Sequence, residues 1–185
     1  LREWRPEVCA HLAWYAEPGK YLDAPVNIQL LGWSLELLQV LAEIGCRNVV
    51  MAGTCAEYDS TFGYLREDTP ARPATLYAAC KHALHLAAGQ LVRLRGMRLA
   101  WGRIFFPYDP GEDPRRAVSA LINALLRGER FKATAGMQVR DYLHVDDVAE
   151  AIATLTDSQA EGAFNIASGA PVTVRALMEL VGDII

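Results

Sequence analysis

A tyrosine and a lysine lie four residues apart in the stretch TLYAACKHAL, at Tyr77 and Lys81. Residues four apart on a helix share one face, so both side chains can reach the same site. A free tyrosine has a pKa of about 10, too high for proton transfer near neutral pH, and a neighbouring ammonium favours the phenolate. The spacing therefore permits a lysine-activated tyrosine, although an isolated pair of this kind is more often an ordinary exposed helix pair.

The histidines and acidic pairs of the chain favour structural roles. His82 and His85 follow Lys81 on the same expected helix without a carboxylate or cysteine at ligand spacing, so the sequence predicts no metal site. Asp146 and Asp147 lie at the start of a later expected helix, where acidic side chains meet the positive end of the helix dipole. We expect these two residues to cap that helix.

Strands and helices alternate through the first part of the sequence. The expected order is a strand at 7–14, a helix at 27–44, a strand at 48–54, a helix at 74–94 and a strand at 97–106. Such alternation predicts an α/β fold with a parallel sheet and helices on both faces, and ligands bind at the carboxyl ends of such strands. Thr54 and Phe106 should both lie at such ends.

The loop PYDPGEDPRR breaks this pattern with three prolines and a glycine, which indicates a boundary or an excursion to a second lobe. The expected elements beyond it are a helix at 115–127, a short segment around Phe131, a loop through Gly136, a helix at 145–155, a strand at 163–168 and a helix from about 173.

Composition limits the possible partners. The 185 residues are 52% hydrophobic and 22% charged, which is typical of a globular protein. The formal net charge is −4 and the basic residues are scattered, which favours a small-molecule partner over nucleic acid or a membrane surface. Apolar runs fall short of the roughly 20 residues that cross a bilayer. The four cysteines match no metal or disulfide pattern, so we expect reduced thiols and a cytoplasmic protein.

Four blocks occur in a recognisable order: AGTCAEYD, the Tyr77 helix, GRIFFPYDPG, and RDYLHVDDVAEAI followed by FNIASGAPVTV. Over essentially all 185 residues the chain resembles the extended short-chain dehydrogenase/reductases, in particular the NAD-dependent nucleotide-sugar epimerase/dehydratase group. The resemblance implies a Rossmann-type doubly wound sheet at 1–106 and a small substrate-binding lobe at 107–185, with 141–168 returning to the Rossmann domain.

The resemblance also implies roles for single residues. Tyr77 would be the catalytic acid/base, Lys81 would hold the nicotinamide ribose and lower the tyrosine pKa, and Thr54 would orient the reacting oxygen. The segment HLAW would place Ala13 near NAD or NADP, and Arg140 would bind the diphosphate of a nucleotide-sugar. The alternatives are a strand-end hydroxyl for Thr54, a structural strand end for Ala13, and a structural ion pair with Asp141 or a neighbouring residue for Arg140.

Departures from the family pattern affect the residues that would bind the cofactor and the substrate. The glycine-rich turn that receives the pyrophosphate is missing from this sequence, as is the whole first βαβ portion, which indicates a piece of a longer protein or a degenerate relative. Phe106 stands where the family usually has a substrate-binding asparagine, and Asp109 where it has glycine. Dehydratases carry Asp-Glu where this chain has Cys55 and Ala56, and Glu57 could face the site only after a local turn.

The sequence therefore predicts an NAD(P)-dependent nucleotide-sugar epimerase or keto-sugar reductase that uses Thr54, Tyr77 and Lys81, with Arg140 and Phe106 at the substrate. A non-catalytic nucleotide- or sugar-binding relative and a nucleotide-sugar dehydratase stay open as alternatives. Without the pyrophosphate-binding half, this chain by itself should be inactive. The resemblance further implies a homodimer packed through helices that include the one bearing Tyr77.

Overall fold

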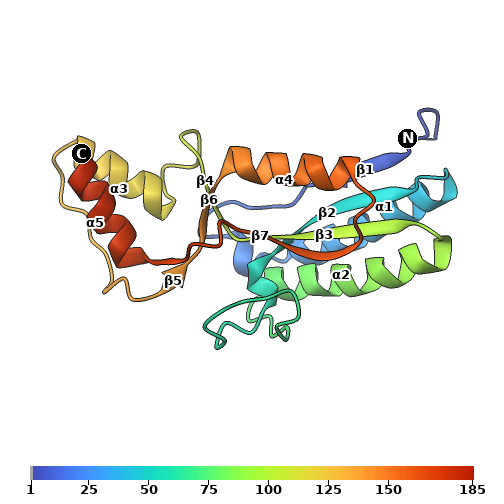
Figure 1. Cartoon of the computed structure of the whole chain (residues 1–185), viewed down its shortest axis with the longest axis horizontal. Coiled ribbons are helices and arrows are strands. Elements are labelled where there is room, and N and C mark those ends of the chain that lie inside the picture. Colours follow the sequence, from blue (N-terminus) through green and yellow to red (C-terminus); the bar gives the residue numbers. More distant parts are fainter. Residues whose placement is uncertain (1) are drawn as a thin grey trace. The chain divides into compact units, whose positions relative to one another are not determined.

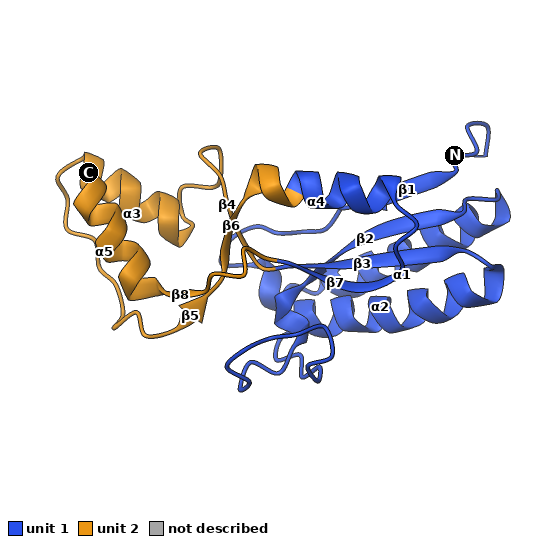
Figure 2. Ribbon diagram, viewed as in Figure 1, with its two compact units in different colours: residues 1–104, 149–166 blue, residues 105–148, 167–185 orange. Residues whose placement is uncertain are grey.

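A computed structural model describes residues 2–185, which form two compact units (Figure 2). Unit 1 comprises residues 1–104 and 149–166, and unit 2 comprises residues 105–148 and 167–185. The elements of unit 1 are β1 (Val8–His11), η1 (Tyr21–Asp23), α1 (Val26–Glu43), β2 (Asn48–Thr54), η2 (Cys55–Glu57), α2 (Leu76–Arg95), β3 (Arg98–Ile104) and β7 (Gly162–Ile166). Helix α4 (Val145–Asp157) begins in unit 2 and ends in unit 1.

A four-stranded parallel sheet in the order β1-β2-β3-β7 forms the centre of unit 1 (Figure 1). Neighbouring residues of β3 point to opposite faces of this sheet. The Trp101 ring stacks on His85 of α2, whereas a side chain at Gly102 would meet Ile152 of α4. Helices therefore cover both faces, which confirms the predicted α/β, Rossmann-type fold.

The main core of unit 1 lies between the sheet, α1 and α2. Because β2 and β3 are central strands, nearly all of their side chains are buried. The core side chains include Leu38, Leu41, Val49, Met51, Leu84, Ala88, Val92 and Trp101. This packing fixes the carboxyl end of β2 against the first turns of α2.

Two predicted strands differ from the structure at their ends. The strand expected at 7–14 is shorter, because regular pairing of β1 with β2 ends at His11. The strand expected at 97–106 ends at Ile104, so the placement of Phe106 at its carboxyl end is wrong. Instead Phe106 opens β4 (Phe106–Tyr108), where its backbone N–H donates to the carbonyl of Asp141 at 3.1 Å.

Unit 2 contains two small ladders and two further helices. Strand β4 pairs in parallel with β6 (Tyr142–His144), and β5 (Val139–Arg140) pairs antiparallel with β8 (Val172–Thr173). Helices α3 (Ala117–Leu126) and α5 (Val174–Ile184) complete the unit. The expected segment around Phe131 has no regular structure. The buried Asp141 carboxylate accepts the backbone N–H groups of Ser168 and Gly169 at 2.7 and 2.9 Å, which fixes the loop after β7.

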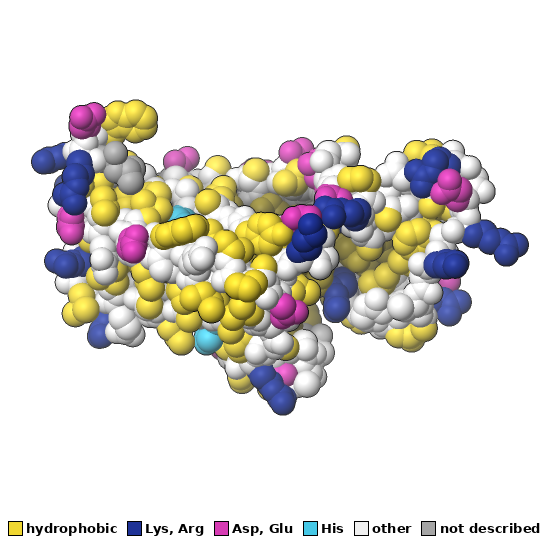
Figure 3. Space-filling model, turned by 180° about the vertical axis from the view of Figure 1, so that it is seen from behind, with side chains coloured by type: hydrophobic (Ala, Val, Ile, Leu, Met, Phe, Trp, Pro, Cys, Tyr) yellow, Lys and Arg dark blue, Asp and Glu magenta, His cyan; other side chains and the backbone are white. Residues whose placement is uncertain are grey.

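Hydrophobic side chains occupy much of the surface of unit 1 in Figure 3. Helices α1 and α2 contribute Ile28, Trp33, Leu86 and Leu94, each more than half exposed. Within residues 2–185, none of the helices is long and apolar enough to cross a membrane.

Candidate active site

Helix α2 carries Tyr77 in its first turn and Lys81 in its second. The helix begins at Thr75, whose hydroxyl accepts the backbone N–H of Ala78 at 3.2 Å, a standard N-cap bond. It ends at Gly96, whose φ of 65° suits glycine. Because the N-cap fixes where the helix starts, it also fixes the positions of Tyr77 and Lys81 relative to the strands of the sheet.

Thr54 and Tyr77 lie together at the carboxyl end of β2, where the Thr54 hydroxyl is close enough to the Tyr77 phenol to lower its pKa. Thr54 is 8% exposed, and Tyr77 is partly buried. Burial raises the pKa of Tyr77 to about 12, and the Thr54 hydroxyl counteracts that rise. The Tyr77 hydroxyl is therefore protonated near neutral pH and has Thr54 as a fixed partner.

Lys81 lies one turn further along α2 and is almost completely buried, at 2% exposed. Its ammonium donates to the carbonyl of Ala52 at 2.8 Å and lies 3.9 Å from the centre of the Trp14 ring. Burial lowers the pKa of Lys81 to about 7. Among the neighbours of Tyr77, Thr54 is the one that lowers its pKa, and activation of Tyr77 by Lys81 stays a prediction.

Two aromatic rings that sequence reasoning missed enclose Tyr77. Tyr21 and Trp14 meet the Tyr77 ring edge-on, with ring centres 4.9 and 6.4 Å away. The fully buried Asn27 holds both, because its side chain accepts the Trp14 indole N–H at 2.7 Å and donates to the Tyr21 carbonyl at 2.6 Å. The sequence offers only a weak signal for such an anchor, an asparagine in the first turn of a helix that follows Trp14 by 13 residues and Tyr21 by six.

Glu57 turns back toward the end of β2 and is completely buried. One carboxylate oxygen, Oε1, accepts the backbone N–H of Thr54 and the indole N–H of Trp101, each at 3.0 Å. The other oxygen, Oε2, lies 3.4 Å from Nε of Arg103. The sequence analysis allowed Glu57 to face the site only after a local turn, and η2 supplies that turn. The pattern Thr-x-x-Glu is also the signature of a capping box, which the structure forms here.

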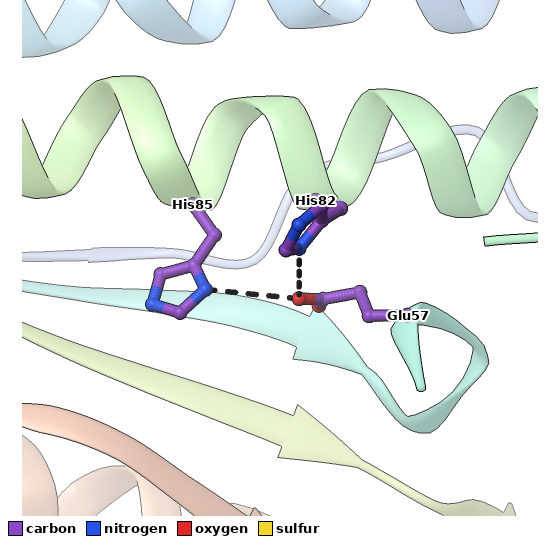
Figure 4. Close-up of side chains that lie close together, drawn as sticks. All are labelled: Glu57, His82 and His85. Carbon is purple, nitrogen blue, oxygen red and sulfur yellow. Dashed lines mark ion pairs between the residues drawn. The ribbon is translucent and has the colours of Figure 1, made fainter. Parts of the chain in front are cut away.

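The expectation that His82 and His85 lack a carboxylate partner is wrong. Both rings point toward Glu57, as Figure 4 shows, and their Nδ1 atoms lie 3.7 and 3.8 Å from Oε2. The carboxylate is 25 or more residues away in the sequence, so no local spacing could reveal it. These three residues offer ligand atoms that all lie within 4.8 Å of one another.

Arg140 and Phe106 lie together in unit 2. The guanidinium carbon of Arg140 is 4.8 Å from the centre of the Phe106 ring, a cation–π distance. The alternative ion pair between Arg140 and Asp141 does not form, because the Asp141 carboxylate accepts bonds from Ser168 and Gly169 instead. The Arg140 Nη1 donates to the Val139 carbonyl at 2.9 Å, and the remaining N–H donors of the planar guanidinium suit phosphate oxygens.

Ala13 lies two residues beyond the carboxyl end of β1 and is exposed. Strand β1 pairs with β2, so Ala13 follows the neighbour of the strand that ends in Thr54. Unit 1 thus brings Thr54, Tyr77 and Lys81 together, and unit 2 brings Arg140 and Phe106 together.

Comparison with known proteins places these features in a family. The model of the NAD dependent epimerase/dehydratase family matches residues 1–167. The dTDP-6-deoxy-L-talose 4-dehydrogenase (NAD(+)) of Aggregatibacter actinomycetemcomitans is 27% identical, covering 94% of this chain and 64% of that protein. The UDP-glucose 4-epimerase of Thermus thermophilus, solved with NAD, has a TM-score of 0.78 at 26% identity, covering 98% of this chain and 63% of that one.

A third match concerns the fold alone. The UDP-N-acetylglucosamine 4-epimerase of Methanobrevibacter ruminantium M1, solved with UDP-N-acetylmuramic acid, superimposes with a TM-score of 0.88 at 23% identity. That match covers 99% of this chain and 62% of the other. In each of these three comparisons the chain spans less than two thirds of the length of the protein that it matches.

Proposed function

The chain belongs to the NAD dependent epimerase/dehydratase family, and from this premise we propose that it carries the acid–base centre of an NAD(P)-dependent nucleotide-sugar epimerase or keto-sugar reductase. The observation that carries the proposal is the juxtaposition of the Thr54 and Tyr77 hydroxyls at the carboxyl end of β2, with Lys81 buried one turn away. A hydroxyl held in this way can pass a proton to or from a sugar oxygen.

Tyr77 would act first as a proton donor. Its raised pKa, about 12, means that the phenol holds its proton near neutral pH. During reduction of a keto-sugar, the Tyr77 O–H bond breaks as the sugar O–H bond forms, and the Thr54 hydroxyl steadies the same oxygen. Epimerisation requires this step and its reverse, in which the tyrosinate takes the proton from a sugar hydroxyl. Both reactions use the same two hydroxyls.

The residues of unit 1 fit a nicotinamide cofactor, which when bound supplies the acceptor and donor of hydride. The Lys81 ammonium gives one of its three N–H donors to the Ala52 carbonyl, which leaves two for ribose hydroxyls. Ala13 would line the same cofactor beyond the end of β1, where ligands of such sheets bind. Ala13, Tyr77 and Lys81 would therefore hold NAD or NADP.

Arg140 and Phe106 would bind the nucleotide-sugar substrate. The Arg140 guanidinium is oriented by the Phe106 ring and can form a bidentate contact with a diphosphate. Phe106 replaces a polar residue of the family, so its ring would orient Arg140 rather than bind the sugar through hydrogen bonds.

Glu57 favours epimerisation or reduction over dehydration. Dehydration requires an additional acid and base to eliminate water, and Cys55 and Ala56 occupy the positions that carry them in dehydratases. Glu57 is the nearest carboxylate in the sequence, but it is completely buried and bonded to Thr54, Trp101 and Arg103. Because these contacts hold Glu57 inside the chain, we infer that it does not supply the missing acid or base.

The test uses the complete gene product that contains this chain. We expect it to bind NAD or NADP in calorimetry and to convert a UDP- or dTDP-sugar, with Tyr77→Phe abolishing turnover while cofactor binding remains. The control is Tyr64→Phe, at a tyrosine that is 71% exposed, which should leave turnover unchanged. Failure of the complete protein to bind either dinucleotide would support the non-catalytic binding alternative and refute the enzyme.

We also propose a homodimer that buries the exposed apolar side chains of α1 and α2. Trp33 of α1 and Leu86 of α2 are both more than half exposed. Light scattering after size exclusion should give a dimer mass for the wild type and a monomer mass for Trp33→Glu. A monomeric wild type refutes this part of the proposal.

A further inference from the structure

Two buried imidazole nitrogens in unit 1 lack a hydrogen-bond partner. The Nδ1 atoms of His82 and His85 are shielded from solvent, and neither is within hydrogen-bonding distance of a protein acceptor or donor. Buried polar atoms are nearly always satisfied, so each such atom indicates a partner such as a water molecule or an ion. Both atoms face the same carboxylate oxygen, Oε2 of Glu57 (Figure 4).

The spacing of these three atoms suits a shared metal ion better than direct hydrogen bonds. The Nδ1 atoms lie 3.7 and 3.8 Å from Oε2, beyond hydrogen-bonding reach. Bonds of about 2.0–2.2 Å to a tetrahedral zinc ion separate neighbouring ligand atoms by about 3.4 Å. The two distances to Oε2 exceed that value by a few tenths of an ångström, and all three ligand atoms lie within 4.8 Å of one another, so side-chain rotations would bring them to zinc-binding distances.

The chemistry of the three groups also matches that of a zinc site. Two imidazoles and one carboxylate are a known ligand set for zinc, and all three must bind without a proton on the ligand atom. Both histidine side chains remain about one quarter exposed, which leaves a route for an ion from solvent.

Arg103 is the group that opposes a cation here, since its Nε lies 3.4 Å from the same Oε2. This contact is long, and Arg103 has two other partners. Its Nη1 donates to the Tyr58 hydroxyl at 2.8 Å and to the Glu67 carbonyl at 3.1 Å. The guanidinium can therefore keep these bonds while Oε2 binds a metal.

We propose that Glu57, His82 and His85 form a binding site for a divalent transition-metal ion of the zinc type, with a fourth position for water. The ion would connect η2, which follows Thr54, to α2, which carries Tyr77 and Lys81. Its role is structural, because it would hold together the two elements that carry the acid–base centre. The site does not depend on the proposed enzymatic activity.

Isothermal titration of the metal-free chain with Zn²⁺ tests this proposal. We expect one bound ion per chain, and Co²⁺ in its place should give the visible absorption of a tetrahedral site. Outer-sphere changes weaken metal sites by about 10–100-fold, so loss of a direct ligand in His82→Ala or His85→Phe should weaken Zn²⁺ binding by at least about 100-fold. The phenylalanine keeps the stack on Trp101, which preserves packing.

His144→Ala is the matched control, because His144 also has a nearby carboxylate, Asp146, at 3.4 Å but no second histidine. It should bind Zn²⁺ as the wild type does. Zinc should raise the melting temperature of the wild type and of this control, and leave that of His82→Ala unchanged. Absence of zinc binding by a folded wild type, or equal binding by His82→Ala and His85→Phe, overturns the proposal and assigns water to the site.

Discussion

The carboxylate of Glu57 accepts the backbone N–H of Thr54 at 3.0 Å, so the residue that ends β2 is held by a side chain three positions later. The same oxygen accepts the indole N–H of Trp101, which lies in the neighbouring strand. One buried carboxylate thus fixes the strand end that presents the Thr54 hydroxyl to Tyr77. This relationship makes the geometry of the acid–base pair dependent on a residue that does not touch the reacting atoms.

Glu57→Gln should strongly destabilise the chain. The change leaves the buried Arg103 without its anion, and breaking a buried ion pair costs about 3–5 kcal/mol. Glu43→Gln is the control, because its pair with Arg2 at 2.9 Å is exposed and should contribute less than about 1 kcal/mol. Urea denaturation measures both free energies of unfolding. Equal effects of the two changes would show that Glu57 is not a buried anchor.

Gly53→Ala should destabilise by about 1–3 kcal/mol, because an added methyl group collides with the Trp101 ring and approaches Glu57 Oε1 to 2.9 Å. Gly89→Ala in α2 is the matched control, since its position is open and alanine is the better helix former by up to about 1 kcal/mol. The two substitutions should therefore change the free energy of unfolding in opposite directions in the same denaturation experiment. A neutral Gly53→Ala would mean that the end of β2 can move away from Trp101.

The buried Lys81 should make stability rise with pH. Its pKa is lowered to about 7 in the folded chain, whereas an unfolded lysine titrates near about 10.4. Between these values the unfolded chain holds one more proton, so the free energy of unfolding gains up to about 1.4 kcal/mol per pH unit. The gain begins near pH 7, and below that pH the cost of burying the ammonium is fully present.

Lys81→Met isolates this effect, because other titrating groups contribute equally to both proteins. From about pH 6 to 9 the wild type should gain stability relative to Lys81→Met, as measured by urea denaturation at each pH. Lys132→Met, at an exposed lysine, should show no such trend. A difference between wild type and Lys81→Met that stays constant with pH contradicts the lowered pKa.

Much of the fold follows from local patterns in the sequence. The apolar run at 48–54 predicted β2 without error, because a central parallel strand is buried on both faces and needs no alternation. The helix expected at 74–94 matches α2, which begins at Leu76 and ends at Arg95. The end of β3 was misplaced because the apolar run continues through Phe105 and Phe106, while the backbone leaves the sheet after Ile104.

The site was only partly accessible to such reasoning. The four-residue spacing of Tyr77 and Lys81 predicted that their side chains share one face of a helix. The position of Thr54 was predicted from the end of a strand, where ligands of such sheets bind. The contacts of Glu57 with His82 and His85 depend on tertiary packing between η2 and α2, which no periodicity encodes. Burial raises the pKa of Tyr77 more than the Thr54 hydroxyl lowers it, and this balance depends on tertiary packing and not on residue spacing.

Arg140→Lys should separate substrate binding from proton transfer in the complete gene product. A lysine keeps the charge but loses the planar fork that the Phe106 ring orients and that matches a diphosphate bidentately. Loss of one such charge-assisted bond costs about 1.5–3 kcal/mol, which corresponds to a KM for the nucleotide-sugar raised by about 10–100-fold. Because Arg140 does not take part in proton transfer, kcat should change little. Steady-state kinetics measure both constants, and a loss confined to kcat would place Arg140 outside the substrate site.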